Sequence, residues 1–305
     1  MAYAIAIWLV SGLLVPVVPF TVSELLRGAW VQFACFLLSA YLMVELNNIN
    51  ALIRIYSRMV SCSFLVLTCA GCFLFSSMAG AIVQLCFIAA YISLFRSYQD
   101  KSAAGWIYYA FLCIGLASTV FVQAIYYMPI LWAIMFFRLT SFSWRTFAAS
   151  LLGVLTPYWF LLPFALIYQG NLDSMVSHFV QLASLPSLYD YSQLTVNQLA
   201  FFVFVVGLTI TGIVHYWRNS HNDSIRIRQL YGTFTVMSFA TTLFLVLQPQ
   251  HYDVLIRILI INVSPLIAHF ITLTSTRVTN IAFYAICSVS VLLTLLNLWM
   301  PSINF

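Results

Sequence analysis

"NNINALIRIYSR" occupies residues 47–58, between the apolar runs "AWVQFACFLLSAYLMVEL" (29–46) and "MVSCSFLVLTCAGCFLFSS" (59–77). Each apolar run approaches the length of about 20 residues that a membrane-spanning helix needs. The polar stretch is therefore predicted to be an elbow between two spans. Arg54 and Arg58 are four residues apart, so on a helical turn they would share a face toward anionic headgroups. A ligand site at this elbow is the alternative interpretation.

The composition of the chain supports a membrane location for most of its length. Of 305 residues, 63% are hydrophobic and only 6% are charged. A soluble protein would carry roughly a quarter charged residues. We therefore expect an all-α, polytopic integral membrane protein whose main partners are membrane lipids. Its net charge of +5 is spread over short loops, so no nucleic-acid partner is predicted.

Apolar segments of spanning length divide the whole chain, residues 1–305, into one predicted transmembrane domain. The first segment, within "MAYAIAIWLVSGLLVPVVPF", lacks the basic start of a cleavable signal peptide and is expected to stay as a span. The sequence predicts about eleven spans, at residues 2–19, 29–46, 59–76, 78–95, 105–121, 123–137, 148–168, 199–217, 231–248, 254–273 and 279–299.

The distribution of Lys and Arg over the loops predicts the orientation. With the N-terminus inside, the cytoplasmic loops hold ten basic residues and the outer loops hold only two, Arg27 and Arg257. The positive-inside rule then favours an N-in, C-out topology in the cell inner (cytoplasmic) membrane. The ten predicted cytoplasmic residues are Arg54, Arg58, Arg96, Lys101, Arg138, Arg145, Arg218, Arg226, Arg228 and Arg277.

The longest connection, residues 169–198, contains no Lys or Arg and is predicted to lie on the outer (periplasmic) side. It carries the ionisable residues Asp173, His178 and Asp190. Long loops in compact proteins are often functional. The stretch "DSMVSHFVQLASL" places apolar residues at helical spacing, so an interfacial helix is expected there.

Strong catalytic and cofactor motifs are absent from the sequence. It contains no P-loop, no dinucleotide fingerprint, no H-E-x-x-H and no nucleophile elbow. The five His residues are dispersed on both predicted sides of the membrane, so no metal site and no cofactor are predicted. Cys69 and Cys72 form a C-x-x-C pair inside an apolar run. We interpret them as packing residues on one helix face with Cys62.

The two basic residues on the predicted outer side have two interpretations. Glu24 precedes Arg27 by three residues, and Asp253 precedes Arg257 by four, so each pair can form a local salt bridge. Alternatively, an Arg at headgroup depth suits a lipid phosphate or pyrophosphate. In that case Glu24 or Asp253 would act as the catalytic acid or base.

The second interpretation gathers a polar cluster on the outer face. Arg27 and Arg257 would bind the anionic substrate, together with His251, Asp173, His178 and Asp190. The sequence does not show that these loops meet. If they do, Arg257→Ala abolishes function without lowering the amount of protein in the membrane.

Residues 44–168 carry a resemblance to a known group of proteins. Its motifs are the Asn-rich elbow, Phe95-Arg96, Ser143-Trp144-Arg145, and Gly153 with Pro157-Tyr158. In spacing they resemble an uncharacterised family of multi-spanning inner-membrane proteins of Bacteroidota. The resemblance implies a helical inner-membrane protein and brings no catalytic residues with it.

A second, fold-level similarity concerns membrane glycosyltransferases that use polyprenyl-phosphate sugars. Basic loops flank a pair of helices here, and a Gly-x-x-x-Pro stretch follows at Gly153. Those enzymes have an acidic residue in the first outer loop, which matches the position of Glu24. Their outer loop is usually longer and often contains Asp, so the sequence departs from that pattern.

Three functional hypotheses follow from the sequence. The first is an envelope-biogenesis protein that binds an anionic or polyprenyl-linked lipid or saccharide on its outer face and acts as a glycosyltransferase-like enzyme or handles the carrier. The second is a small-molecule transporter, which predicts a cavity at the midplane and discontinuous helices, often with inverted repeats. The sequence shows no internal repeat, which counts against this hypothesis. The third is a non-catalytic membrane scaffold.

Overall fold

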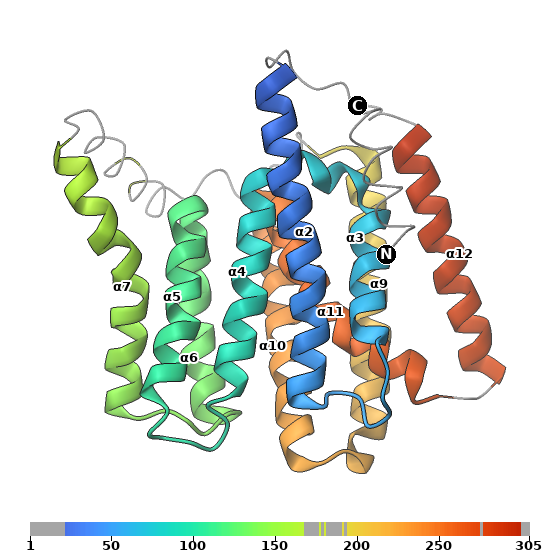
Figure 1. The fold of residues 1–305 in the computed structure, drawn as a ribbon. Helices are drawn as coiled ribbons and strands as arrows, with labels where there is room; N and C mark the ends of the chain where they lie inside the picture. Colours follow the sequence, from blue (N-terminus) through green and yellow to red (C-terminus); the bar gives the residue numbers. More distant parts are fainter. Residues whose placement is uncertain are drawn as a thin grey trace. The chain divides into compact units, whose positions relative to one another are not determined.

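The computed structural model describes residues 22–167, 177, 180, 191, 194–274 and 277–299. The described residues form helices and no β-strand, and helix makes up 86% of the structure (Figure 1). The chain divides into two compact units. Unit 1 comprises Met1–Ala81 with Asp190–Phe305, and unit 2 comprises Ile82–Tyr189. The prediction of a single transmembrane domain remains a prediction, and the units are described separately.

Unit 1 contains six α-helices and three short 3₁₀ helices among its described residues. They are α2 (Val22–Asn50), α3 (Met59–Ala70), η1 (Cys72–Ser76), α9 (Val196–Asn219), η3 (Ser220–Asn222), α10 (Ile225–Leu247), η4 (Pro249–His251), α11 (Tyr252–Thr272) and α12 (Arg277–Trp299).

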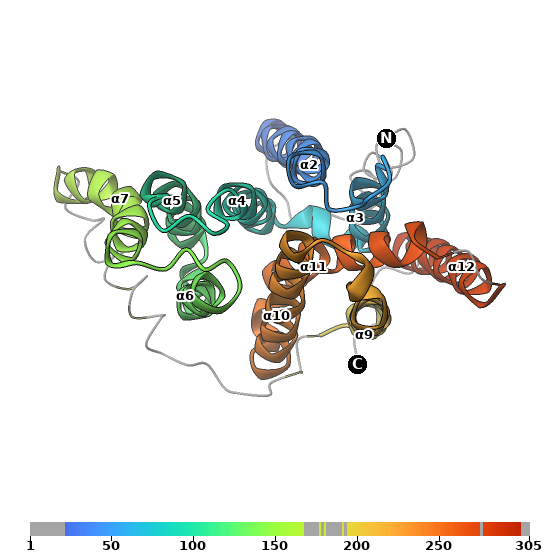
Figure 2. The same cartoon turned by 90° about the horizontal axis from the view of Figure 1, so that it is seen from below.

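Helix α11 forms the core of unit 1. Its sequence "VLIRILIINVSPLIAHF" is apolar on every side, as expected for a helix surrounded by other helices. Every residue from Val254 to His269 is buried. Helices α3, α9 and α10 pack around it, as Figure 2 shows from below. Two of its buried residues, Arg257 and His269, are ionisable, so α11 carries polar chemistry into the centre of the unit.

The third predicted span is interrupted in the structure. The sequence predicts one helix over 59–76, but α3 ends at Ala70, and η1 follows Gly71. Side chains from other helices donate to the main-chain oxygens freed by this break: Nδ2 of Asn297 donates to Ala70 at 2.6 Å, and Arg257 donates to Leu74. Buried carbonyls require such donors, so the break depends on α11 and α12.

The cysteine prediction is confirmed in one part and wrong in another. Cys69 and Cys72 are buried against Phe36, and Sγ of Cys72 donates to the main-chain oxygen of Cys69 at 2.9 Å. Cys62 is exposed and does not share this packing. The predicted common face assumed an unbroken helix, whereas Cys72 lies beyond the end of α3.

Unit 2 contains α4 from Ile82 onward, α5, α6, α7 and one 3₁₀ helix. The elements are α4 (Met78–Phe95, which begins in unit 1), α5 (Ala104–Val120), η2 (Val122–Tyr127), α6 (Met128–Phe137) and α7 (Trp144–Ile167).

Helices α5 and α7 pack closely through two glycines. A Cβ atom at Gly153 would lie 2.6 Å from the main-chain oxygen of Tyr108, and one at Gly115 would lie 2.8 Å from that of Val154. Small residues allow such backbone approach between membrane helices. Two hydroxyl pairs flank the glycines, Tyr108 with Thr156 at 3.0 Å and Ser118 with Tyr158 at 2.8 Å.

The helices agree with the predicted membrane character. Among the described residues, seven helices are long and apolar enough to cross a membrane, and three further apolar helices have 10–17 residues. The predicted segment 2–19 lies outside the described residues. The count of eleven spans and the N-in, C-out orientation therefore remain predictions.

Within each unit, loops that carry predicted cytoplasmic basic residues meet one another. In unit 1, Nη1 of Arg54 donates to the main-chain oxygen of Asn222 at 2.9 Å. In unit 2, the N–H of Gln99 donates to Leu139 at 2.8 Å, and the hydroxyl of Ser143 donates to the oxygen of Lys101 at 3.0 Å. Each unit thus brings together loops that carry basic residues.

Candidate functional site

The polar stretch 47–58 folds into an elbow stabilised by its own asparagines. Nδ2 of Asn47 donates to the main-chain oxygen of Ser57 at 2.9 Å, which joins the two ends of the elbow. Nδ2 of Asn50 donates to Leu46 at 3.0 Å at the end of α2. Ala51 has φ of 47°, so the chain turns sharply immediately after the helix. Two of the three asparagines therefore have a structural role.

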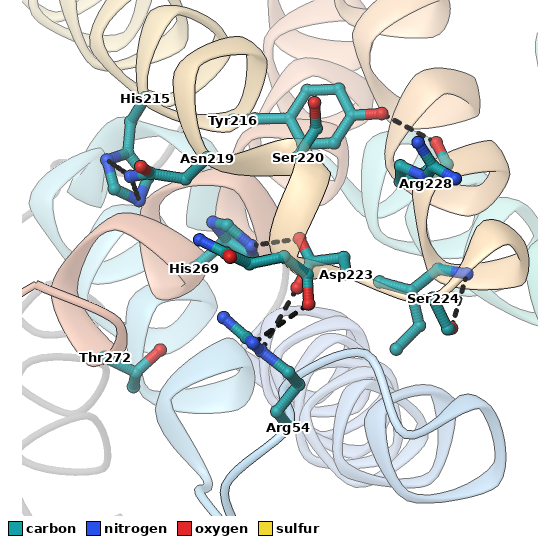
Figure 3. Close-up of polar contacts among 12 residues, drawn as sticks. Arg54, His215, Tyr216, Asn219, Ser220, Asp223, Ser224, Arg228, His269 and Thr272 are labelled. Atoms are coloured by element: carbon teal, nitrogen blue, oxygen red, sulfur yellow. Dashed lines mark hydrogen bonds and ion pairs between the residues drawn. The ribbon is translucent and has the colours of Figure 1, made fainter.

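The elbow also places Arg54 against the carboxylate of Asp223. Nε of Arg54 lies 3.2 Å from Oδ1 of Asp223, and Nε2 of His269 lies 3.0 Å from Oδ2 (Figure 3). Asp223 and His269 side chains are each 1% exposed. Three segments far apart in the sequence thus converge on one buried carboxylate.

The loop between α9 and α10 explains why Asp223 is held there. The short turn η3 ends the α9 helix, and Ser224 then caps α10 by accepting a hydrogen bond from the N–H of Ile227 at 3.4 Å. Asp223 comes immediately before this cap, where the positive end of a helix dipole favours a negative charge. The loop binds the elbow a second time, because Nη2 of Arg226 donates to Oδ1 of Asn50 at 3.3 Å.

Aromatic and imidazole rings from α9 and α10 surround His269. The ring centroids of His215 and Tyr231 lie 5.3 Å and 4.8 Å from that of His269. Nδ2 of Asn219 lies 3.0 and 3.1 Å from the two ring nitrogens of His215. Figure 3 shows His215 of α9 and His269 of α11 grouped with the loop residues Arg54 and Asp223. We refer to these four residues as the Asp223 cluster.

The hydrogen bond to Asp223 sets the state of His269. A carboxylate only accepts, so Nε2 carries the hydrogen and Nδ1 of a neutral ring is left as an acceptor. Nδ1 of His269 is buried and has no hydrogen-bond partner among the residues that the structure describes. Burial of the ring disfavours its protonated form, whereas the contact with Asp223 favours it, so Nδ1 is the atom at which this site can take up a proton. Among the described residues no group of His, Cys, Asp and Glu is arranged to hold a metal ion.

The predicted outer cluster contains one residue with well-described contacts, Arg257. It is 3% exposed and lies in the second turn of α11. It donates to the main-chain oxygen of Leu74 and, at 3.4 Å, to that of Ser77. Gly80 makes room for it, because a Cβ there would lie 2.7 Å from Nε of Arg257. These contacts give Arg257 a structural role at the break after α3.

We expect Arg257→Ala to lower the stability of the protein. Each buried carbonyl left without a donor costs about 1–3 kcal/mol. Thermal unfolding in detergent, followed with a thiol-reactive dye, measures the effect. The exposed Arg277 of the same unit provides the control, and Arg277→Ala should leave the unfolding temperature unchanged. An unchanged unfolding temperature in Arg257→Ala would contradict the structural role and favour the predicted phosphate contact.

The remaining residues of the predicted outer site are described partly or not at all. His251 ends η4, and Asp253 lies in the first turn of α11 and is partly buried. Glu24 and Arg27 lie on α2, but the structure does not describe their side chains. Asp173, His178, Asp190 and most of the predicted loop 169–198 lie outside the described residues. The convergence of these residues stays a prediction.

Sequence reasoning missed Asp223 and the role of His269. A usable signal exists, since Asp223 is an acid in a predicted cytoplasmic loop rich in Arg, and His269 is a titratable residue at membrane depth. Their separation of 46 residues hides the contact. Arg54 was singled out, but its partner was not identifiable.

Comparisons with protein-family models, with curated proteins and with solved structures find no match to this chain.

Proposed function

We propose that this protein is a small-molecule transporter of the cell inner membrane, with the elbow 47–58 facing the cytoplasm. The observation that carries the proposal is the Asp223 cluster. A carboxylate with a 1% exposed side chain accepts from His269 and Arg54 where the elbow, α9, α10 and α11 meet. Ionisable groups inside membrane bundles are costly and commonly belong to ion pathways or proton relays.

The energetics of the cluster support a functional role over a scaffold role. Burying the carboxylate of Asp223 costs solvation energy, which its contacts with His269 and the half-exposed Arg54 must offset, so this contact is weak evidence for a purely stabilising role. His269 also retains a buried ring nitrogen without a partner. A scaffold gains nothing from this arrangement, whereas a transporter that exchanges protons needs it.

A helix break provides a second line of support. In unit 1 the predicted span 59–76 is interrupted, because the chain leaves α3 at Gly71 and continues through η1 before α4 begins at Met78. Discontinuous helices are frequent in secondary transporters, where they form the binding region. Such a break is one of the features that the sequence-based transporter hypothesis predicts.

The outer-face site for a polyprenyl-linked saccharide remains a competing proposal. The described contacts of Arg257 are with main-chain oxygens of unit 1, which supports a structural function for this residue. The other proposed substrate ligands, apart from His251, have no described side chains. The transporter proposal rests on the described contacts of the Asp223 cluster, and the lipid proposal becomes an outcome of its test.

Reconstituted vesicles test the transporter proposal. The full chain is placed in liposomes that contain a pH-sensitive dye, and amino acids, monosaccharides, nucleosides and carboxylic acids are added one at a time. We expect at least one class to drive a proton flux that empty liposomes lack and that His269→Gln lowers at least tenfold, because glutamine binds no proton.

The opposing outcome is equally specific. If no solute class drives a flux, and cells depleted of the protein accumulate one saccharide-carrying polyprenyl lipid, the transporter proposal is wrong. That profile, restored by the wild-type protein, would support the envelope function. Normal lipid profiles without any flux would favour the scaffold.

A further inference from the structure

We propose that His269 and Asp223 form a proton-binding site that controls the attachment of the elbow through Arg54. Protonation of His269 would release Arg54 from Asp223 and open this end of unit 1. The inference deepens the proposed transport function, on whose site it rests, by assigning the coupling ion and the segment that moves.

The first step of the argument is the unequal burial of the two charged partners. The side chain of Arg54 is 44% exposed, whereas that of Asp223 is 1% exposed. Arg54 can therefore leave for water at little cost in solvation, while Asp223 needs a cationic or donating partner inside the protein. The contact between Arg54 and Asp223 can therefore be exchanged for contacts of Arg54 with water, whereas the buried contact between His269 and Asp223 cannot.

The second step is the competition for the carboxylate. With neutral His269, the charges of Asp223 and Arg54 balance. When hydronium donates a proton to the lone pair on Nδ1, an O–H bond of hydronium breaks, an N–H bond forms, water is released and the site gains one positive charge. The imidazolium then attracts Asp223 more strongly and repels Arg54, so the contact with Arg54 weakens. Opening also admits water to Nδ1, which otherwise lacks a partner.

The other titratable groups near His269 do not replace Arg54 or His269 as partners of the Asp223 carboxylate. Helix α9 brings His215 and Tyr216, α10 brings Tyr231, and Arg218 lies near His215. Apart from Cys62 and Cys69, α3 carries no titratable side chain. Asp223 is the acidic group among these neighbours. A positive charge on His269 would therefore interact mainly with the charges of Asp223 and Arg54.

The elbow covers apolar side chains that report its opening. Leu52 and Ile53, the two residues immediately before Arg54, are only 1% and 5% exposed. Tyr56, on the same elbow, is 84% exposed. If the elbow detaches, a thiol at Leu52 becomes accessible, whereas a thiol at Tyr56 is accessible in both states.

The test measures labelling with a membrane-impermeant maleimide in the full-length protein. Leu52→Cys is compared with Tyr56→Cys at each pH, so that the ratio of the two rates cancels the titration of the thiol itself. The parent chain measures the labelling of its seven native cysteines. We expect the ratio to rise at least fivefold between about pH 8 and pH 5.5.

Substitutions at two further positions, His269 and Arg54, make the result specific. In His269→Gln the ratio should stay low at every pH, because no proton can bind. In Arg54→Gln it should stay high, and Arg54→Lys should restore part of the pH dependence if Arg54→Gln does not fold. A ratio that does not change with pH, or changes equally in His269→Gln, would overturn the proposal.

The labelling experiment needs no solute, so it separates this inference from the proposed function. Labelling that depends on pH without any solute flux keeps the proton-controlled elbow and rejects the transporter. Solute flux with labelling that does not depend on pH keeps the transporter and rejects the elbow mechanism.

Discussion

Asp223→Asn is expected to lower the solute-driven proton flux to below a tenth of the wild-type rate, while the protein stays folded. Asparagine has nearly the same shape as aspartate but carries no charge. Its single carbonyl oxygen cannot hold Arg54 and His269 as the two carboxylate oxygens do, at 3.2 and 3.0 Å. Without the negative charge, protonation of His269 loses its stabilising partner.

The stability cost of this substitution is expected to be modest. A hydrogen bond to a charged group contributes about 1.5–3 kcal/mol, and Arg54 regains water when it is released. Typical stabilities of 5–15 kcal/mol tolerate such a loss. Size-exclusion profiles and unfolding temperatures, measured beside the flux, therefore distinguish loss of function from loss of fold.

Asp100 provides the matched control for Asp223. It lies in an exposed turn of unit 2, and Ser102 donates to it from its hydroxyl at 2.6 Å and from its N–H at 2.8 Å. These bonds hold the pKa of the Asp100 carboxyl below its usual value. Asp100→Asn should leave the flux unchanged. Equal losses in both variants, or full flux in Asp223→Asn, would show that the cluster has no role in transport.

Gly153→Ala is the second substitution with a large expected effect, here on stability. Its Cβ would lie 2.6 Å from the main-chain oxygen of Tyr108 and 2.9 Å from the nitrogen of Leu112. Neither backbone atom can move away without shifting α5. Forcing extra atoms into a packed interface costs roughly 1–3 kcal/mol, and separation of the helices also strains the bond between Tyr108 and Thr156.

Gly105 at the start of α5 is the control for this prediction. No atom lies within 4 Å of a Cβ built there, so Gly105→Ala should leave the unfolding temperature unchanged or raise it slightly. Gly115→Ala, on the facing helix, should resemble Gly153→Ala. If Gly153→Ala unfolds at the wild-type temperature, the close approach of α5 and α7 is not the source of stability in unit 2.

Local patterns predicted the helical segments well because they depend on neighbouring residues. Apolar runs predicted α4 at 78–95, as the structure has it, and α5 to within one residue at each end. The prediction of one unbroken helix over 59–76 was wrong. Gly71 alone is a weak signal, and the break is stable because Arg257 and Asn297 reach it from α11 and α12.

The elbow shows where sequence reasoning stopped. The stretch 47–58 was expected to anchor the orientation of the chain, with a ligand site as the alternative. Asn47 and Asn50 hold the backbone of the elbow, while the half-exposed Arg54 pairs with the buried carboxylate of Asp223. The sequence drew attention to Arg54 as a predicted orientation anchor but did not identify its partner, since nothing local connects residues 54 and 223.

By itself, the sequence determined the membrane class of this protein, its all-helical architecture and the positions of most helices, because the solvent and the backbone hydrogen bonds act on each segment separately. Only the tertiary structure decided which ionisable residues meet. It turned Arg257 toward the carbonyls of a broken helix and brought Arg54, Asp223 and His269 together. Electrostatic interactions depend on distances in space, and those distances are set by helix packing between segments remote in the chain.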